Sequence, residues 1–293
     1  MAHVLVEQMP ELERPVLVAA FSGWPDAAEV GSGALAYLIR TLGAKRFATL
    51  DPEPFYVFGE SRPTTLVIGG GERALTWPAS EFFAARDPSG RDLVLFLARE
   101  PNVRWHEYLQ AVLDLAERLQ VGPLVSLGGT YDRVSHRGAA TVSGWSPTPE
   151  LRHSLASLGV RFTNYEGPSS IQAALMEACT RRGIAGASLW GHAPHYVSGI
   201  ANPKVAHTVL LRLVELLGLQ VDLDALAVAG RDMEAQIEQV LLGRQDLSDY
   251  VLGLQMHPYE TPETSGQDAL PSTQSIVEDL EAFLRQLESD DDD

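Results

Sequence analysis

The sequence has a single cysteine, Cys179, among its 293 residues. One cysteine excludes a disulfide within the chain and any zinc site built from several thiolates. Its apolar runs are all much shorter than the roughly 20 residues that a membrane-spanning helix needs. The N-terminal segment also lacks the basic and apolar parts of a signal peptide. We therefore expect no membrane partner and a cytoplasmic location.

Basic residues are scarce: the sequence has 22 lysines and arginines but 39 aspartates and glutamates, which gives a formal net charge of −17. A protein that binds nucleic acid needs clustered lysine and arginine, so the composition argues against nucleic-acid partners. Most of the excess acid follows residue 255, where Arg285 is the one basic residue. We expect residues 257–293 to form an acidic, largely flexible tail.

Nucleotide and hydrolase motifs are missing as well. The sequence contains no Walker A motif, and the pair of glycines at Gly31 and Gly33 lacks the third glycine of a dinucleotide fingerprint. The stretch Gly186 to Trp190 has no closing glycine, so it is not the nucleophile elbow of an α/β-hydrolase. The sequence therefore predicts no cofactor.

The clearest local pattern is an apolar run, Val16 to Phe21, followed by the loop Ser22-Gly23-Trp24-Pro25 and small and apolar residues at helical spacing. This pattern predicts a buried strand, a tight loop and a helix. Ligands of open α/β sheets bind at the carboxyl ends of strands, which makes this loop a candidate binding site. Asp26 either belongs to that site or only offsets the helix dipole.

Strand and helix patterns alternate five or six times up to about residue 220, which predicts a three-layer α/β/α core over residues 1–220. A hairpin signal, Thr64 to Ile68 and Arg73 to Trp77 around three glycines, predicts a mixed rather than purely parallel sheet. Residues 221–256 read as an appended helical hairpin, broken near Gly243.

Polar residues gather where later strands are expected to end. We predict that ligand- or partner-binding residues are among them, and the candidates are Asp132, His136, Arg137, Glu166, Gly167, Trp190, His192, His195 and Tyr196. Histidine beside carboxylate suits a metal site or general acid–base chemistry. The same residue types also form hydrogen-bonded structural clusters or subunit contacts, and we favour this interpretation. We predict no metal and no catalytic residue.

Five short motifs in order resemble the PAC2 family, the proteasome assembly chaperone family, in the bacterial branch often labelled "ATP-grasp superfamily". They are FSGWPDAAE, Ser61-Arg62-Pro63, Gly128-Gly129 with Asp132 and His136-Arg137, YEGPSSI, and SLWGHAPHYV with Asn202-Pro203-Lys204. The likeness runs from about Val16 to about Gln255. It implies a core similar to purine nucleoside phosphorylases, homo-oligomers, and a role in assembling protein complexes.

The resemblance also implies docking through a C-terminal hydrophobic-Tyr-any tripeptide, whereas the sequence given ends in Asp291-Asp292-Asp293. We expect a non-catalytic oligomeric assembly chaperone or scaffold that binds other proteins. The alternative is a binding protein or enzyme for a nucleoside- or phosphate-like molecule. In that case Ser22 and Gly23 would hold an anion that pairs with Arg62 or Arg137. His192, His195 or Glu166 would then donate and accept protons.

Overall fold

A computed structural model describes residues 3–68 and 71–256. The acidic tail predicted at residues 257–293 lies outside this range. Within it, no helix combines the length and the apolar character that crossing a membrane would require.

The core of the protein is a nine-stranded sheet with the strand order β1-β3-β6-β7-β2-β8-β11-β9-β10. Its centre is parallel, since β2 pairs in parallel with β7 and β8, and β8 with β11. The flanking pairs β1-β3, β3-β6, β6-β7 and β9-β11 are antiparallel. The strands are β1 Val4–Val6, β2 Val16–Ser22, β3 Lys45–Leu50, β6 Ser80–Arg86, β7 Asp92–Arg99, β8 Leu124–Asp132, β9 Val142–Trp145, β10 Arg161–Phe162 and β11 Gly186–Pro194.

Helices cover both faces of this sheet, which confirms the predicted three-layer α/β class with a mixed sheet. Alternate residues of β2 point to opposite faces, so Val16 and Val18 join α1 and α5, while Leu17 and Phe21 join α2 and α4. The helices are α1 Val30–Thr41, α2 Trp105–Arg118, α3 Pro149–Ser157, α4 Ile171–Arg182, α5 Pro203–Leu217, α6 Asp224–Leu242 and α7 Gln245–Met256.

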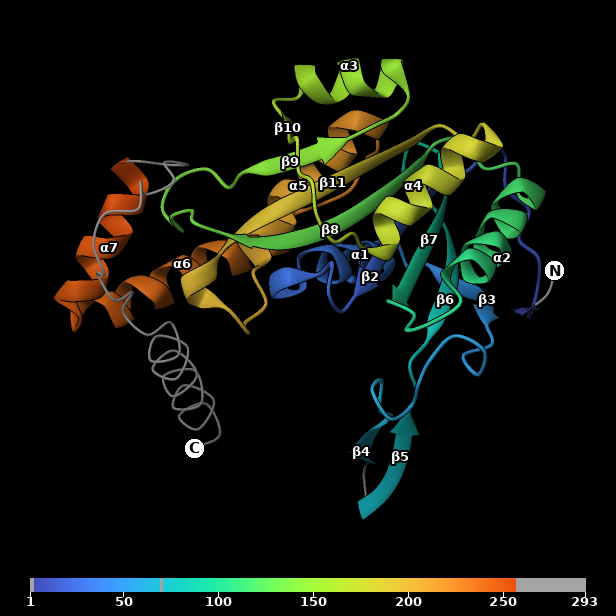
Figure 1. The fold of residues 1–293 in the computed structure, drawn as a ribbon, viewed down its shortest axis with the longest axis horizontal. Coiled ribbons are helices and arrows are strands. Elements are labelled where there is room, and N and C mark those ends of the chain that lie inside the picture. Colours follow the sequence, from blue (N-terminus) through green and yellow to red (C-terminus); the bar gives the residue numbers. More distant parts are fainter. Residues whose placement is uncertain (1–2, 69–70, 257–293) are drawn as a thin grey trace.

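The predicted hairpin exists, but it does not join the main sheet. Strands β4 Thr64–Ile68 and β5 Glu72–Thr76 form a separate two-stranded sheet. The hairpin projects from the rest of the protein (Figure 1). The mixed character of the large sheet comes instead from its antiparallel flanking strands, of which β6 and β9 have no counterpart among the predicted elements.

Two central strands run further than the sequence pattern indicates. β8 continues through Gly128-Gly129 to Asp132, and β11 continues to Pro194. The continuous parallel ladder between them pairs Thr130 with His192. His192 therefore lies within a strand, whereas the sequence pattern predicts that the strand ends before it, in a loop that contains His192 and His195. Glycine is needed at position 129, because a Cβ there would lie 2.5 Å from the carbonyl oxygen of Ala27.

Helices α6 and α7 meet at Gly243, as the sequence indicated, and lie at one end of the molecule (Figure 1). Apolar residues of the pair pack against Tyr196 and Val197, at the carboxyl end of β11. This packing fixes the two helices beside the polar residues that end β8 and β11. The division at residues 220 and 256 stays a prediction.

Candidate functional site

The end of β8 and the adjoining part of β11 bring Asp132 and His192 together. The Nδ1 of His192 lies 2.8 Å from Oδ2 of Asp132, and its Nε2 lies 2.7 Å from Oγ of Ser143 in β9. The hydrogen bond from His192 lowers the pKa of Asp132 below its ordinary value, more than burial raises it. Asp132 is therefore an ionised acceptor at the edge of the sheet.

The next residues of the chain extend this cluster toward α7. His195 and Tyr196 lie in a short 3-10 helix, His195–Val197, directly after β11. The Nδ1 of His195 donates to the carbonyl oxygen of Asp132 at 3.1 Å, and its Nε2 lies 3.0 Å from the Tyr250 hydroxyl. The carbonyl can only accept, so Nδ1 carries a proton.

His136 is buried behind Tyr196. The Tyr196 hydroxyl accepts from the backbone N–H of His136 and lies 2.7 Å from its Nδ1, while Nε2 lies 2.8 Å from Oε1 of Glu238. The carboxylate can only accept, so Nε2–H donates to it; in the neutral ring Nδ1 is then the acceptor, and the Tyr196 hydroxyl donates to it. Burial lowers the pKa of His136, more than Glu238 raises it, so the ring is neutral near pH 7.

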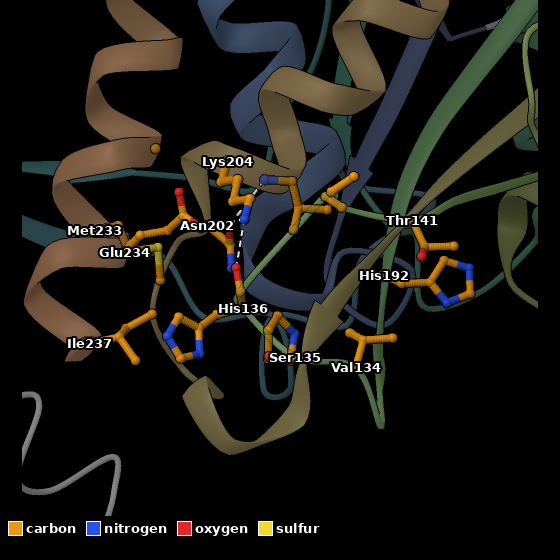
Figure 2. A pocket seen from close by; sticks show the side chains of 15 residues that line it. Val134, Ser135, His136, Thr141, His192, Asn202, Lys204, Met233, Glu234 and Ile237 are labelled. Atoms are coloured by element: carbon orange, nitrogen blue, oxygen red, sulfur yellow. Dashed lines mark hydrogen bonds and ion pairs between the residues drawn. The ribbon is translucent and has the colours of Figure 1, made fainter. Parts of the chain in front are cut away.

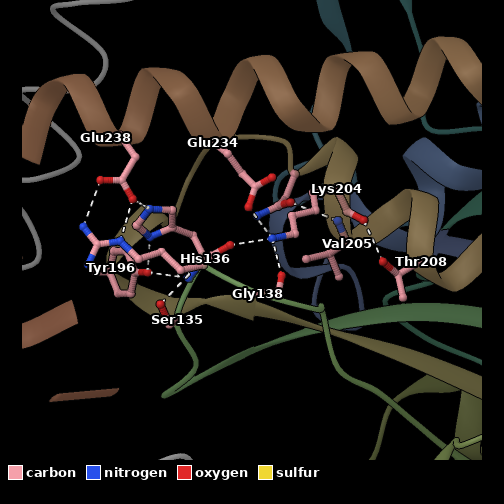
Figure 3. A network of polar contacts seen from close by, with 11 residues as sticks. Ser135, His136, Gly138, Tyr196, Lys204, Val205, Thr208, Glu234 and Glu238 are labelled. Carbon is pink, nitrogen blue, oxygen red and sulfur yellow. Dashed lines mark hydrogen bonds and ion pairs between the residues drawn. The ribbon is translucent and has the colours of Figure 1, made fainter. Parts of the chain in front are cut away.

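Glu238 joins α6 to the segment after β8 (Figure 3). Arg137 donates to both of its carboxylate oxygens, at 2.6 and 2.8 Å. The hydrogen bond from Arg137 comes first among the causes that lower the pKa of Glu238 to about 2. Such a bidentate contact between a guanidinium and a carboxylate fixes the orientation of both side chains and pairs their charges.

One helical turn earlier on α6, Glu234 forms an ion pair with Lys204. The Lys204 ammonium also donates to the carbonyl oxygens of His136 at 2.6 Å and Gly138 at 2.5 Å. Figure 3 shows Glu234 and Glu238 projecting from the same face of α6 toward these groups. The two glutamates therefore attach α6 to the core at two points.

A small pocket lies between α6 and the segment after β8 (Figure 2). It leaves about 20 Å³ for the centres of water molecules. One water needs roughly 10–15 Å³ in this measure, so the pocket has room for water and not for a nucleoside. Its lining residues are Val134, Ser135, His136, Ala139, Ala140, Thr141, His192, Pro194, Asn202, Lys204, Val205, Gly230, Met233, Glu234 and Ile237.

Of the candidate residues predicted after β2, Asp26 has a structural role. Asp26 precedes α1, and its Oδ1 accepts the N–H groups of Gly31 at 2.8 Å and Ser32 at 3.0 Å. Its carboxylate therefore satisfies amides at the helix N-terminus, which is the alternative that the sequence left open. Burial raises the pKa of Asp26. The loop residue Gly23 has φ +112°, and Trp24 is 63% exposed.

The remaining candidates lie in separate places. Ser22 ends β2, where its carbonyl oxygen accepts the N–H of Glu100. Arg62 is exposed just before the β4–β5 hairpin, and Glu166 and Gly167 are exposed between β10 and α4. Trp190 lies within β11 and pairs with Ser143. The hydrogen-bonded cluster around Asp132, His136 and His192 does not include these five residues, so the candidates do not form one site.

The sequence analysis missed the residues that complete the cluster: Ser143, Glu234, Glu238 and, as a partner of His195, Tyr250. The spacing of Glu234 and Glu238, four residues apart on one helix, was available as a signal of a shared face. No group of three or more metal-ligating side chains is found among residues 3–68 and 71–256. The histidines His136, His192 and His195 each use both ring nitrogens in bonds within the protein.

Comparisons with known proteins place this arrangement in a family. A PAC2 family protein from Streptomyces avermitilis is 37% identical, with a TM-score of 0.74 over 81% of this chain and 99% of that chain. A proteasome-assembly chaperone homologue from Mycobacterium tuberculosis is 32% identical, with a TM-score of 0.73 over 80% and 99%. An archaeal proteasome activator from Pyrococcus furiosus shares the fold at 21% identity, with a TM-score of 0.63 over 81% and 97%.

No curated protein matches the sequence. The family model of PAC2 matches residues 20–241, which run from the end of β2 through the remaining strands of the sheet to almost the end of α6. The chain belongs to the PAC2 family.

Proposed function

We propose that this protein is an assembly chaperone or scaffold that acts as a homo-oligomer and binds other proteins. Membership of the PAC2 family supports the proposal, together with a relative named as a proteasome-assembly chaperone homologue. The cytoplasmic location expected from the sequence belongs to this proposal, and cell fractionation tests it.

The observation that carries the proposal is the exposed β4–β5 hairpin. Leu66 and Ile68 on one face are each 47% exposed, while Val67 and Leu75 on the other are 72% and 55% exposed. A two-stranded hairpin alone is marginally stable in water, and clustered exposed apolar side chains mark interaction surfaces. The hairpin therefore offers both faces to another protein.

A second copy of this chain is the occupant that the charges favour. The chain carries a net charge of −17, most of it after residue 255, so copies repel one another. The hairpin strands carry only Glu72 and Arg73, which cancel. Self-association through this near-neutral apolar surface costs little electrostatic repulsion.

Sedimentation velocity of Val67→Lys tests the proposal. Val67 is 72% exposed, so lysine there is compatible with the folded chain but places a charge in the contact. The matched control is Val228→Lys, because Val228 is 46% exposed on α6. We expect wild type and Val228→Lys to sediment as the same oligomer and Val67→Lys to dissociate. A monomeric wild type, or an unchanged Val67→Lys oligomer, would contradict the proposal.

A further inference from the structure

Three side chains on adjacent strands form a continuous line of hydrogen bonds that the proposed assembly function does not use. β11 lies between β8 and β9 in the sheet, and it supplies His192, which reaches Asp132 on one side and Ser143 on the other. The two contacts measure 2.8 and 2.7 Å. Because all three residues lie on strands of one sheet, the arrangement needs no loop movement to form.

The partners decide which atoms carry protons. An ionised carboxylate can only accept, so Nδ1 of His192 carries the proton that it shares with Asp132. In the neutral ring Nε2 is then the acceptor, and the Ser143 hydroxyl donates to it. A serine hydroxyl that donates to a histidine whose other nitrogen is held by a carboxylate is the arrangement that activates serine as a nucleophile.

The surroundings of Ser143 suit an ester with an apolar or aromatic group. Trp190 is its cross-strand partner on β11, and Trp145 follows two residues later on the same face of β9. Trp145 is 45% exposed, so this aromatic surface reaches solvent beside Ser143, which is itself buried. On the other side β10 pairs Arg161 with Ser143, and the charge of Arg161 acts on Asp132.

We infer that Ser143 is a nucleophile for acyl transfer from esters, with His192 as its general base and Asp132 as a positioning residue. The Ser143 proton passes to Nε2 of His192 as Oγ bonds to the acyl carbon. The bond to the leaving alcohol breaks, and the alcohol takes that proton. Water then attacks the acyl-serine, gives its proton through His192 and releases the acid, which restores the hydroxyl.

Labelling of the full-length protein with a fluorophosphonate, followed by peptide mass mapping, tests this inference. Attack by Oγ displaces fluoride and leaves one stable adduct per chain, which we expect on Ser143. Hydrolysis of 4-nitrophenyl acetate gives a second readout. Ser143→Ala should abolish both, and Asp132→Asn should slow both by about 10²- to 10⁴-fold, because the ring loses its orientation.

Ser188→Ala is the matched control, since Ser188 lies on the same face of β11 and its hydroxyl bonds to the Trp145 carbonyl instead of a histidine. This variant should label at the wild-type rate. The mapped position of the wild-type adduct decides the question even if a variant fails to fold. An unlabelled wild type, under conditions that fully label a known serine hydrolase, would overturn the inference, as would an adduct on another residue. Neither result bears on the oligomeric state, which the sedimentation experiment on Val67→Lys tests separately.

Discussion

Replacing Glu238 by glutamine tests how α6 is held on the core. Glutamine keeps the shape of the side chain but removes the charge that Arg137 pairs with at 2.6 and 2.8 Å. The hydrogen bonds and charges around Glu238 lower its pKa from 4.5 to about 2. In the absence of solvent screening, that difference would correspond to about 3 kcal/mol of folding free energy.

Solvent reduces this figure, because 42% of the Glu238 side chain is exposed. We therefore expect Glu238→Gln to lower the free energy of unfolding at pH 7 by about 1–2 kcal/mol. Urea unfolding followed by circular dichroism measures the change. Glu215→Gln is the matched control, since Glu215 is 43% exposed and pairs with Arg212, which lies on α5 like Glu215. It should change stability by less than about 0.5 kcal/mol.

The difference between wild type and Glu238→Gln should also depend on pH. The pKa of Glu238 is lower in the folded protein, so its contribution is complete above about pH 4.5 and is lost as the pH falls toward 2. At pH 3 roughly half of the difference should remain or less. Equal stabilities of Glu238→Gln and Glu215→Gln at pH 7, or a difference that grows on acidification, would refute the reasoning.

Three further predictions concern the core. Gly129→Ala should destabilise the fold by roughly 1–3 kcal/mol in thermal melts, because the added Cβ would lie 2.5 Å from a backbone oxygen. Gly33→Ala is the control and should be neutral or stabilising, because the space around Gly33 is open. Asn202→Ala should cost about 1 kcal/mol in urea unfolding, because the side chain caps α5 by accepting from Val205 at 3.0 Å, and Asn202→Asp should keep the cap. Burial raises the pKa of the Cys179 thiol to about 12, so a thiol reagent at pH 8 should react only after denaturant is added; modification of the native protein would show that the thiol is accessible.

Local signals in the sequence predicted the elements that local interactions define. The apolar run from Val16 matches β2, Val16–Ser22. The ends of α5 carry the residues that typically begin and end a helix: the Asn202 side chain is the cap, Pro203 is the first helical residue, and Gly218 follows the last one at φ +63°. Such signals can be recognised in a sequence because helix caps and turns depend on interactions between residues a few positions apart.

Other features depend on neighbours that are distant in the sequence. β9, Val142–Trp145, is four residues long and contains a glycine, so it is a strand only because β11 lies beside it. The contact between His136 and Glu238 joins residues 102 positions apart. It depends on how α6 packs on the core, which no local pattern specifies. The sequence therefore indicated which side chains gather after β8 and β11 but not the partners on α6 and β9.

Native mass spectrometry of the purified full-length protein at low activation energy tests the central claim most directly, because it reports subunit number and any retained small molecule together. We predict a discrete multiple of 31.9 kDa with no added mass. A monomer would contradict the claim that the protein acts as a homo-oligomer. A stoichiometric extra mass, released on denaturation, would favour the alternative of a small-molecule binding protein and contradict the proposed assembly role.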